Sequence, residues 1–232
     1  MFTVTSKSFN IVKLMHLLTG SARAVTFLIV AVALGGCASA KYSALEKVGI
    51  HKRDILVDDV EDARDSQAET REHLVAAYEE LNALVGREGG KLEKQYKRLN
   101  KEVEQARDAT GELDDRLRSI DRVSEDLFEE WESELELYSS QALRNDQAKK
   151  LAESRRQFRQ MRERMQVARN RVDPVMAVLN DNVLYLKHSL NAQAVAALRG
   201  EAANLEADVE ALIRDMQIAI DEADAFISKM RG

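Results

Sequence analysis

Apolar residues recur in alternating steps of three and four along the chain after residue 90. The series runs unbroken to Trp131, and only two of its positions, Thr110 and Ser124, are polar. This heptad spacing is typical of a helix that buries one stripe against other long helices in a coiled coil. It predicts one long middle helix over residues 91–170. The apolar positions of its first half are Leu92, Tyr96, Leu99, Val103, Ala106, Leu113, Leu117, Ile120, Leu127 and Trp131.

A second heptad series lies upstream, over residues 45–84, and the segment Gly86-Arg87-Glu88-Gly89-Gly90 separates the two series. Glycines placed in this way end helices and form turns. If the chain reverses there, the two apolar stripes face each other in antiparallel register, and Gln67 falls opposite Thr110. The sequence therefore predicts a helical hairpin with a turn near residues 86–90.

A third heptad series follows Pro174 and continues to Met230. Asp173-Pro174 is typical of a helix start, with an N-cap residue followed by the first helical position. We therefore predict a second turn near residues 171–174; the alternative is a single kinked helix through Pro174. The predicted fold class is all-α, an elongated antiparallel coiled coil of three long helices arranged as two overlapping hairpins. Trp131 is expected to be buried where the three helices overlap.

The start of the chain has a different pattern. An apolar run of 11 residues, 24–34, follows a segment with three cations and no acid. The run is too short to span a bilayer, which takes about 20 residues, and it fits the core of a signal peptide. It ends in Leu34-Gly35-Gly36-Cys37, which resembles the lipobox of bacterial lipoproteins. The resemblance implies signal cleavage between Gly36 and Cys37 and lipid on Cys37; the alternative is an ordinary signal peptide.

These expectations divide the chain into a removed signal peptide (1–36), a lipidated tether (37–44) and an elongated helical coiled-coil domain (45–232). Met15 is a second candidate for the first residue. Ala38, directly after the lipobox, favours the periplasmic face of the outer membrane as the location. Because Leu45 falls opposite Trp131 in the predicted register, the lipid is expected to hold the rod near its middle, so that the rod lies along the bilayer.

The amino-acid composition and the absence of known motifs limit the kinds of activity expected for this protein. The chain is 32% charged and contains one proline and one tryptophan, which suits long exposed helices better than a compact α/β enzyme. The sequence contains no phosphate-binding glycine loop, CxxC pair or HExxH motif, and we expect no cofactor and no metal site. The four histidines are scattered, at His16, His51, His73 and His188. Acids such as Glu129, Glu130 and Glu132 are expected to face solvent, so no catalytic residue is assigned and an enzyme is not expected.

Charge is unevenly distributed. Residues 144–171 carry ten cations and three acids, whereas residues 112–136 carry eleven acids and three cations. A basic segment beside the predicted second turn attracts anions, such as phospholipid headgroups, lipopolysaccharide phosphates or an acidic envelope protein. Export argues against nucleic acid as a ligand, and the alternative is neutralisation of charge between neighbouring helices. The candidate anion-binding basic tip consists of Arg155, Arg156, Arg159, Arg162, Arg164, Arg169 and Arg171.

The segment 47–57, KVGIHKRDILV, resembles the opening of an uncharacterised family of Gram-negative envelope proteins, and residues 127–132 and 184–191 are also similar to that family. The resemblance implies a helical, exported protein and supplies no catalytic residues. We therefore expect a non-enzymatic envelope lipoprotein that serves as a helical scaffold or adaptor, attached to the membrane through Cys37 and bound to an envelope protein. The alternative is a membrane-surface protein that binds or shapes lipid. The sequence leaves the oligomeric state open.

Overall fold

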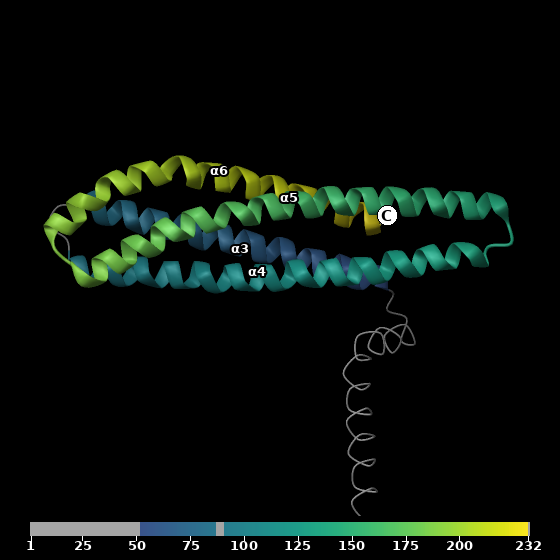
Figure 1. Ribbon diagram of the computed structural model, residues 1–232, viewed down its shortest axis with the longest axis horizontal. Helices are drawn as coiled ribbons and strands as arrows, with labels where there is room; N and C mark the ends of the chain where they lie inside the picture. Colours follow the sequence, from purple (N-terminus) through teal and green to yellow (C-terminus); the bar gives the residue numbers. More distant parts are fainter. Residues whose placement is uncertain (1–51, 87–90, 232) are drawn as a thin grey trace, which may run out of the picture. The chain divides into compact units, whose positions relative to one another are not determined.

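The computed structural model of the protein describes residues 52–86 and 91–231. Within these residues the chain forms four α-helices and one short 3-10 helix, and no strand (Figure 1). The elements are α3 (Lys52–Gly86), α4 (Leu92–Glu134), η1 (Leu135–Leu137), α5 (Gln141–His188) and α6 (Ala192–Arg231). The predicted all-α class is confirmed, but the described residues contain four long helices instead of three.

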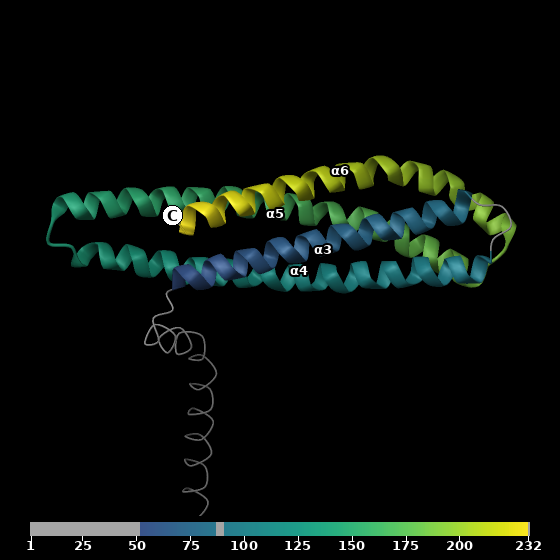
Figure 2. The same cartoon turned by 180° about the vertical axis from the view of Figure 1, so that it is seen from behind.

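Successive helices run antiparallel, and each packs against two others (Figures 1 and 2). Helices α4 and α6 both lie against α3, and both also lie against α5. This arrangement is a four-helix bundle, in which each helix turns one apolar stripe towards a shared core. Side chains from every helix are fully buried there, among them Leu74, Leu113, Met161, Leu179 and Phe226.

The first hairpin has the register that the heptads predict. Helix α3 ends at Gly86 and α4 begins at Leu92, on either side of the predicted turn. Two contacts cross between these helices at matching positions: Arg98 Nε donates to a carboxylate oxygen of Glu80 at 2.9 Å, and the Ser119 hydroxyl donates to Asp59 at 2.8 Å. The predicted polar layer is also inside, since Gln67 is fully buried and Thr110 is 9% exposed.

The predicted second turn near residues 171–174 is wrong. Helix α5 continues through Pro174, as in the alternative of a single helix, and ends at His188. A proline inside a helix removes one backbone hydrogen bond and costs about 3 kcal/mol. Burial of Val172, Val175 and Met176 around the proline offsets this cost. The Asp173 carboxylate accepts a hydrogen bond from Arg169 at 2.7 Å, and it caps no helix because none begins there.

The predicted middle helix over residues 91–170 is also wrong, because the chain reverses between η1 and α5. Tyr138 has extended backbone angles, and Ser140 caps α5 by accepting a hydrogen bond from the Leu143 backbone N–H. The α5–α6 turn has a similar cap, in which the Asn191 side chain accepts from the Ala194 N–H at 3.0 Å. Serine and asparagine are favoured at such N-cap positions.

Trp131 is half-buried, and the three-helix overlap predicted around it does not form because α4 ends at Glu134. The signal cleavage site at Gly36, the lipidation site at Cys37 and the position of Leu45 lie outside the described residues. Among the helices that the structure describes, none combines the length and the apolar character that crossing a membrane requires.

Candidate functional site

Helices α4 and α5 extend past the first residue of α3 and the last residue of α6 (Figures 1 and 2). We call this extension, residues 129–150, the overhang. Lys52, the first described residue of α3, marks its base because the lysine Nζ lies 2.9 Å from a carboxylate oxygen of Glu130. Phe128 and Leu151 are the last buried residues on the two helices, and none of residues 129–150 is buried.

The overhang contains several apolar side chains although it has no buried core. Leu137 is 82% exposed and Leu143 is 56% exposed. The heptad stripe of α4 continues from buried Leu127 to Trp131 and Leu135, neither of which is buried. The same apolar pattern that fills the bundle core therefore continues into a region where α3 and α6 no longer cover it. This exposed apolar surface makes the overhang a candidate interaction site.

A groove of about 320 Å³ lies at the base of the overhang, where α3 begins beside α4 and α5. Trp131 and Leu127 supply its apolar wall. Its charged and polar lining comes from Arg53, Glu130, Glu134, Gln147 and Lys150. This combination of an indole with both signs of charge is suited to holding amphipathic side chains of a partner.

One arginine organises the turn at the end of the overhang. Arg144 of α5 donates from Nε to the backbone carbonyl of Leu135 at 2.9 Å. Its Nη2 donates to the backbone carbonyl of Glu136 at 3.3 Å and to the Glu136 carboxylate at 3.0 Å. A cation placed on the last carbonyls of a helix satisfies acceptors that have no partner within the helix. The turn is therefore held in one conformation while Leu137 points into solvent.

Three phenylalanines close the core just below the overhang. The rings of Phe128 and Phe158 meet edge to face with centroids 5.8 Å apart, and those of Phe158 and Phe226 do so at 5.9 Å. The guanidinium of Arg155 lies 5.8 Å from the Phe128 ring centroid, and its Nη2 donates to the Glu132 carboxylate at 2.6 Å. These contacts join α4, α5 and α6 at the level where the four-helix core ends.

The seven arginines predicted as a basic tip lie in the middle of α5, and no turn follows them. Their predicted place at a tip is therefore wrong. Five of the seven form ion pairs, and four of these pairs join α5 to another helix, which supports the alternative of neutralisation between helices. These pairs are Arg155–Glu132, Arg156–Glu153, Arg162–Asp121, Arg169–Asp114 and Arg171–Asp215. Arg159 and Arg164 have no ion pair within the described part of the chain.

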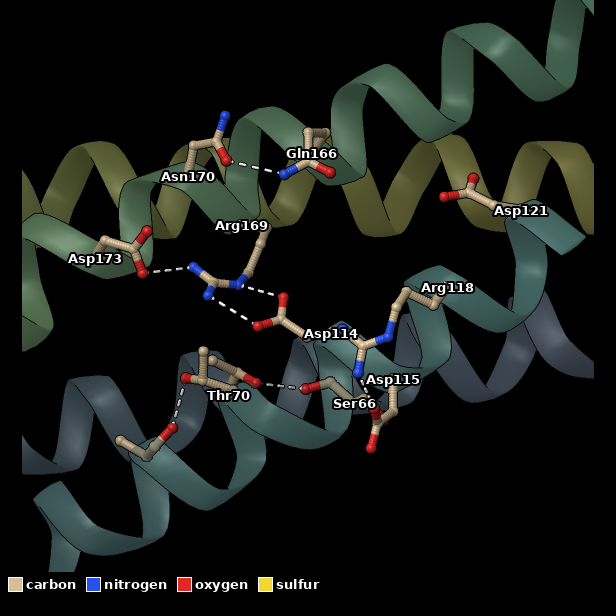
Figure 3. A network of polar contacts seen from close by, with 12 residues as sticks. Ser66, Thr70, Asp114, Asp115, Arg118, Asp121, Gln166, Arg169, Asn170 and Asp173 are labelled. Atoms are coloured by element: carbon tan, nitrogen blue, oxygen red, sulfur yellow. Dashed lines mark hydrogen bonds and ion pairs between the residues drawn. The ribbon is translucent and has the colours of Figure 1, made fainter.

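The pair between Arg169 and Asp114 is the least exposed of these contacts (Figure 3). Nε and Nη2 of Arg169 donate to the two carboxylate oxygens of Asp114 at 2.6 and 2.9 Å, and Nη1 donates to Asp173 at 2.7 Å. The hydrogen bonds to Asp114 raise the pKa of Arg169 above its usual value. A bidentate guanidinium–carboxylate contact fixes both distance and orientation, so this pair sets how α4 and α5 lie against each other.

The two histidines in the described residues lie on different helices, His73 on α3 and His188 on α5. His73 lies 3.3 Å from Glu102 across the α3–α4 interface, and His188 is the last residue of α5. His16 and His51 lie outside the described residues. Among residues 52–86 and 91–231, no group of histidine, cysteine or acidic side chains is arranged to hold a metal ion.

Residues 41–230 match a family model described as a protein of unknown function, DUF2959. The chain belongs to this family. The match covers the overhang, the groove and all four described helices, and it includes the three segments that resemble an uncharacterised family. No curated protein and no solved structure matches the chain.

Proposed function

We propose that the protein is a lipid-anchored, non-enzymatic scaffold or adaptor of the bacterial envelope that holds a protein partner in the groove beside Trp131. In this proposal the signal peptide is removed after Gly36, and Cys37 carries the lipid at the periplasmic face of the outer membrane. The lipobox-like segment supports the anchor, and the groove is the observation that supports the partner.

The groove suits a protein partner better than a small substrate. Small-molecule sites enclose most of the ligand, whereas this groove lies open along α4 and α5. Half-buried aromatic side chains ringed by polar groups are typical of interface hot spots. An amphipathic helix of a partner would place apolar residues on Trp131 and a cation beside Glu134.

The length of the helices supports a scaffolding role. Helix α5 has 48 residues, which corresponds to about 70 Å. A bundle of this length can present surfaces to a partner well away from its attachment point. The alternative of lipid binding along the whole length has less support, because most of the arginines that would contact phosphates are paired with acids of the same chain.

Site-specific photo-crosslinking in cells tests the partner. A photo-reactive phenylalanine analogue at Gln147, in the groove wall, should give one discrete adduct with another envelope protein. The same analogue at Val167, which is 40% exposed on α5 and far from the groove, is the matched control. Trp131→Ala should abolish the adduct. Identical adduct patterns from both positions, or none from Gln147, would contradict the proposed adaptor site.

Metabolic labelling with a fatty acid tests the anchor. The wild-type chain should incorporate label, and Cys37→Ser should lose it because Cys37 is the only cysteine in the sequence. Ala38→Ser is a control that leaves the thiol in place and should keep the label. Equal labelling of wild type and Cys37→Ser would end the lipoprotein interpretation.

A further inference from the structure

We infer that the turn at the end of the overhang, formed by Leu137, Tyr138 and the first turn of α5, enters the interfacial region of the lipid bilayer that carries the anchor. The bundle then stands on this end, and the opposite end, where α5 meets α6, points away from the membrane. The inference rests on the proposed lipid anchor at Cys37 and adds a second membrane contact made by the folded chain itself.

The apolar side chains at this turn lie on the surface of the bundle. Leu137 has the largest exposed fraction of the large apolar side chains in the described residues, at 82%. Leu143 is 56% exposed and Tyr138 is 37% exposed. Leucine and tyrosine together suit the boundary between headgroups and acyl chains, since a tyrosine ring can lie in apolar surroundings while its hydroxyl stays in contact with water.

Three hydrogen-bond acceptors at the turn already have a partner within the protein, so they depend less on water. A buried carbonyl or carboxylate without a hydrogen bond is costly when it leaves water. Arg144 donates to the carbonyl oxygens of Leu135 and Glu136 and pairs with the Glu136 carboxylate. Because the Arg144 guanidinium donates hydrogen bonds to these acceptors, Leu137 can leave water while the carbonyl oxygens of Leu135 and Glu136 and the Glu136 carboxylate keep a hydrogen-bond partner.

The chain enters the bundle at the overhang end, because α3 begins at Lys52. Residues 38–51 separate Cys37 from Lys52, and this segment spans at most about 50 Å when fully extended. Lys52 contacts Glu130, from which the helix continues for about 10 Å to Leu137. The far end of α3, by contrast, lies 35 residues or about 50 Å from Lys52. The chain that follows the anchor therefore enters the bundle near the overhang, whereas the sequence alone predicted an entry near the middle of a rod.

The negative charge of the overhang limits how much of it can contact an anionic membrane. Residues 129–136 contain five glutamates and no cation, and cations of neighbouring segments pair with three of these glutamates, Glu130, Glu132 and Glu136, which leaves a smaller negative charge. An anionic leaflet repels such a segment, and repulsion falls off within about 10 Å at moderate salt. The contact is therefore restricted to the tip, and it should be stronger on zwitterionic than on anionic vesicles.

The test uses the only cysteine as an artificial anchor. The mature chain is coupled through Cys37 to a maleimide lipid in phosphatidylcholine vesicles, which makes the experiment independent of lipidation in cells. Two single-tryptophan proteins are compared: Trp131→Phe with Tyr138→Trp at the tip, and Trp131→Phe with Leu184→Trp near the opposite end. Leu184 is a matched control because it is also an exposed apolar residue, at 55%. Circular dichroism checks that both proteins are folded.

Vesicles with brominated acyl chains should quench the tip protein and leave the control unchanged. At an insertion depth of about 5–10 Å, we expect the tip tryptophan to lose about half of its fluorescence. Adding Leu137→Glu to the tip protein should remove the quenching, and adding phosphatidylglycerol should reduce it. Quenching of both proteins, of neither, or of the control alone overturns the inference. Absence of fatty-acid label from the wild-type chain in cells would overturn only the anchor, so the two failures are distinguishable.

Discussion

Helices α4 and α5 run through both the four-helix body of the bundle and the overhang, and the heptad stripe of α4 continues from one region into the other. In the body, α3 and α6 cover this stripe, and Leu113, Ile120 and Met161 are fully buried. In the overhang the stripe continues through Trp131 and Leu135, but neither is buried. A heptad stripe therefore identifies which face of a helix is apolar, whereas the neighbouring helices decide whether that face becomes core or surface.

The two regions also use arginine differently. In the body, Arg162 and Arg169 each hold both oxygens of an aspartate on α4, at Asp121 and Asp114. In the overhang, Arg144 bonds mainly to backbone carbonyls of its own turn. The first use aligns two helices along their length, and the second stabilises one turn in a defined shape.

The largest expected effect is in the body core. Leu113→Ala should lower the free energy of unfolding by about 2–5 kcal/mol, because Leu113 is fully buried and the substitution leaves a cavity in the core. Leu143→Ala in the overhang should change it by less than about 0.5 kcal/mol. Urea unfolding followed by circular dichroism measures both. Equal losses for the two variants would mean that the overhang has a core of its own.

Removal of the partly buried ion pair between Arg169 and Asp114 should have the next largest effect. Arg169→Ala leaves Asp114 partly buried without its cation and should cost about 1–3 kcal/mol. Arg164→Ala, on the exposed face of the same helix, should be nearly neutral. A double-mutant cycle with Asp114→Ala separates the pair from the loss of arginine packing. A coupling energy near zero would show that the contact does not align α4 with α5.

A smaller effect, of opposite sign, is expected at the polar layer of the body. Gln67 is fully buried, and neither its amide nitrogen nor its amide oxygen has a hydrogen-bond partner in the described part of the chain. Thr110 does not serve as that partner, since its hydroxyl donates to the Ala106 carbonyl at 2.6 Å. Gln67→Leu should raise the free energy of unfolding by about 1 kcal/mol, measured by urea unfolding. A loss of stability would point to a bound water or a partner for the amide.

The smallest expected effect is a change in the pKa of Glu153, which lies on α5 where the body meets the overhang. Hydrogen bonds from Arg156 and then Gln157 lower the pKa of Glu153 from 4.5 to about 2. Because the folded-state pKa is the lower one, the contribution to stability is present above pH 4.5 and is lost as pH falls through about 2. Carboxyl NMR should show this low midpoint, and Arg156→Gln should move it towards 4.5. A midpoint near 4.5 in the wild type would mean that this exposed pair does not form in solution.

The sequence predicted the individual helical faces more accurately than the turns. Leu99, Val103, Leu113 and Ile120 are buried as their heptad positions require. The break before α5 was missed, although Ser139-Ser140 before Gln141 is a usable N-cap signal. Asp173-Pro174 is the more familiar helix-start pattern, but it lies within α5.

The candidate site was less predictable than the core. Two successive steps of four residues, from Leu127 to Trp131 and from Trp131 to Leu135, interrupt the heptad series in this region, but they do not by themselves indicate an exposed groove. The groove and the overhang depend on where α3 begins and α6 ends relative to α4 and α5. The relative positions of these helix ends depend on contacts between segments that are far apart in the sequence. The pattern within one helix does not predict them.

By itself, the sequence determined that the protein is built from long helices and which stripe of each is apolar, because both follow from residues three and four positions apart. Only the tertiary structure decided where the chain reverses after α4. A heptad series offers nearly equivalent pairings at every shift of seven residues, so several turn positions satisfy the same stripes. Burial of Val172, Val175 and Met176 around Pro174 and the contact of Phe158 with Phe128 and Phe226 stabilise one of these pairings. That selection leaves the apolar end of the α4–α5 hairpin uncovered.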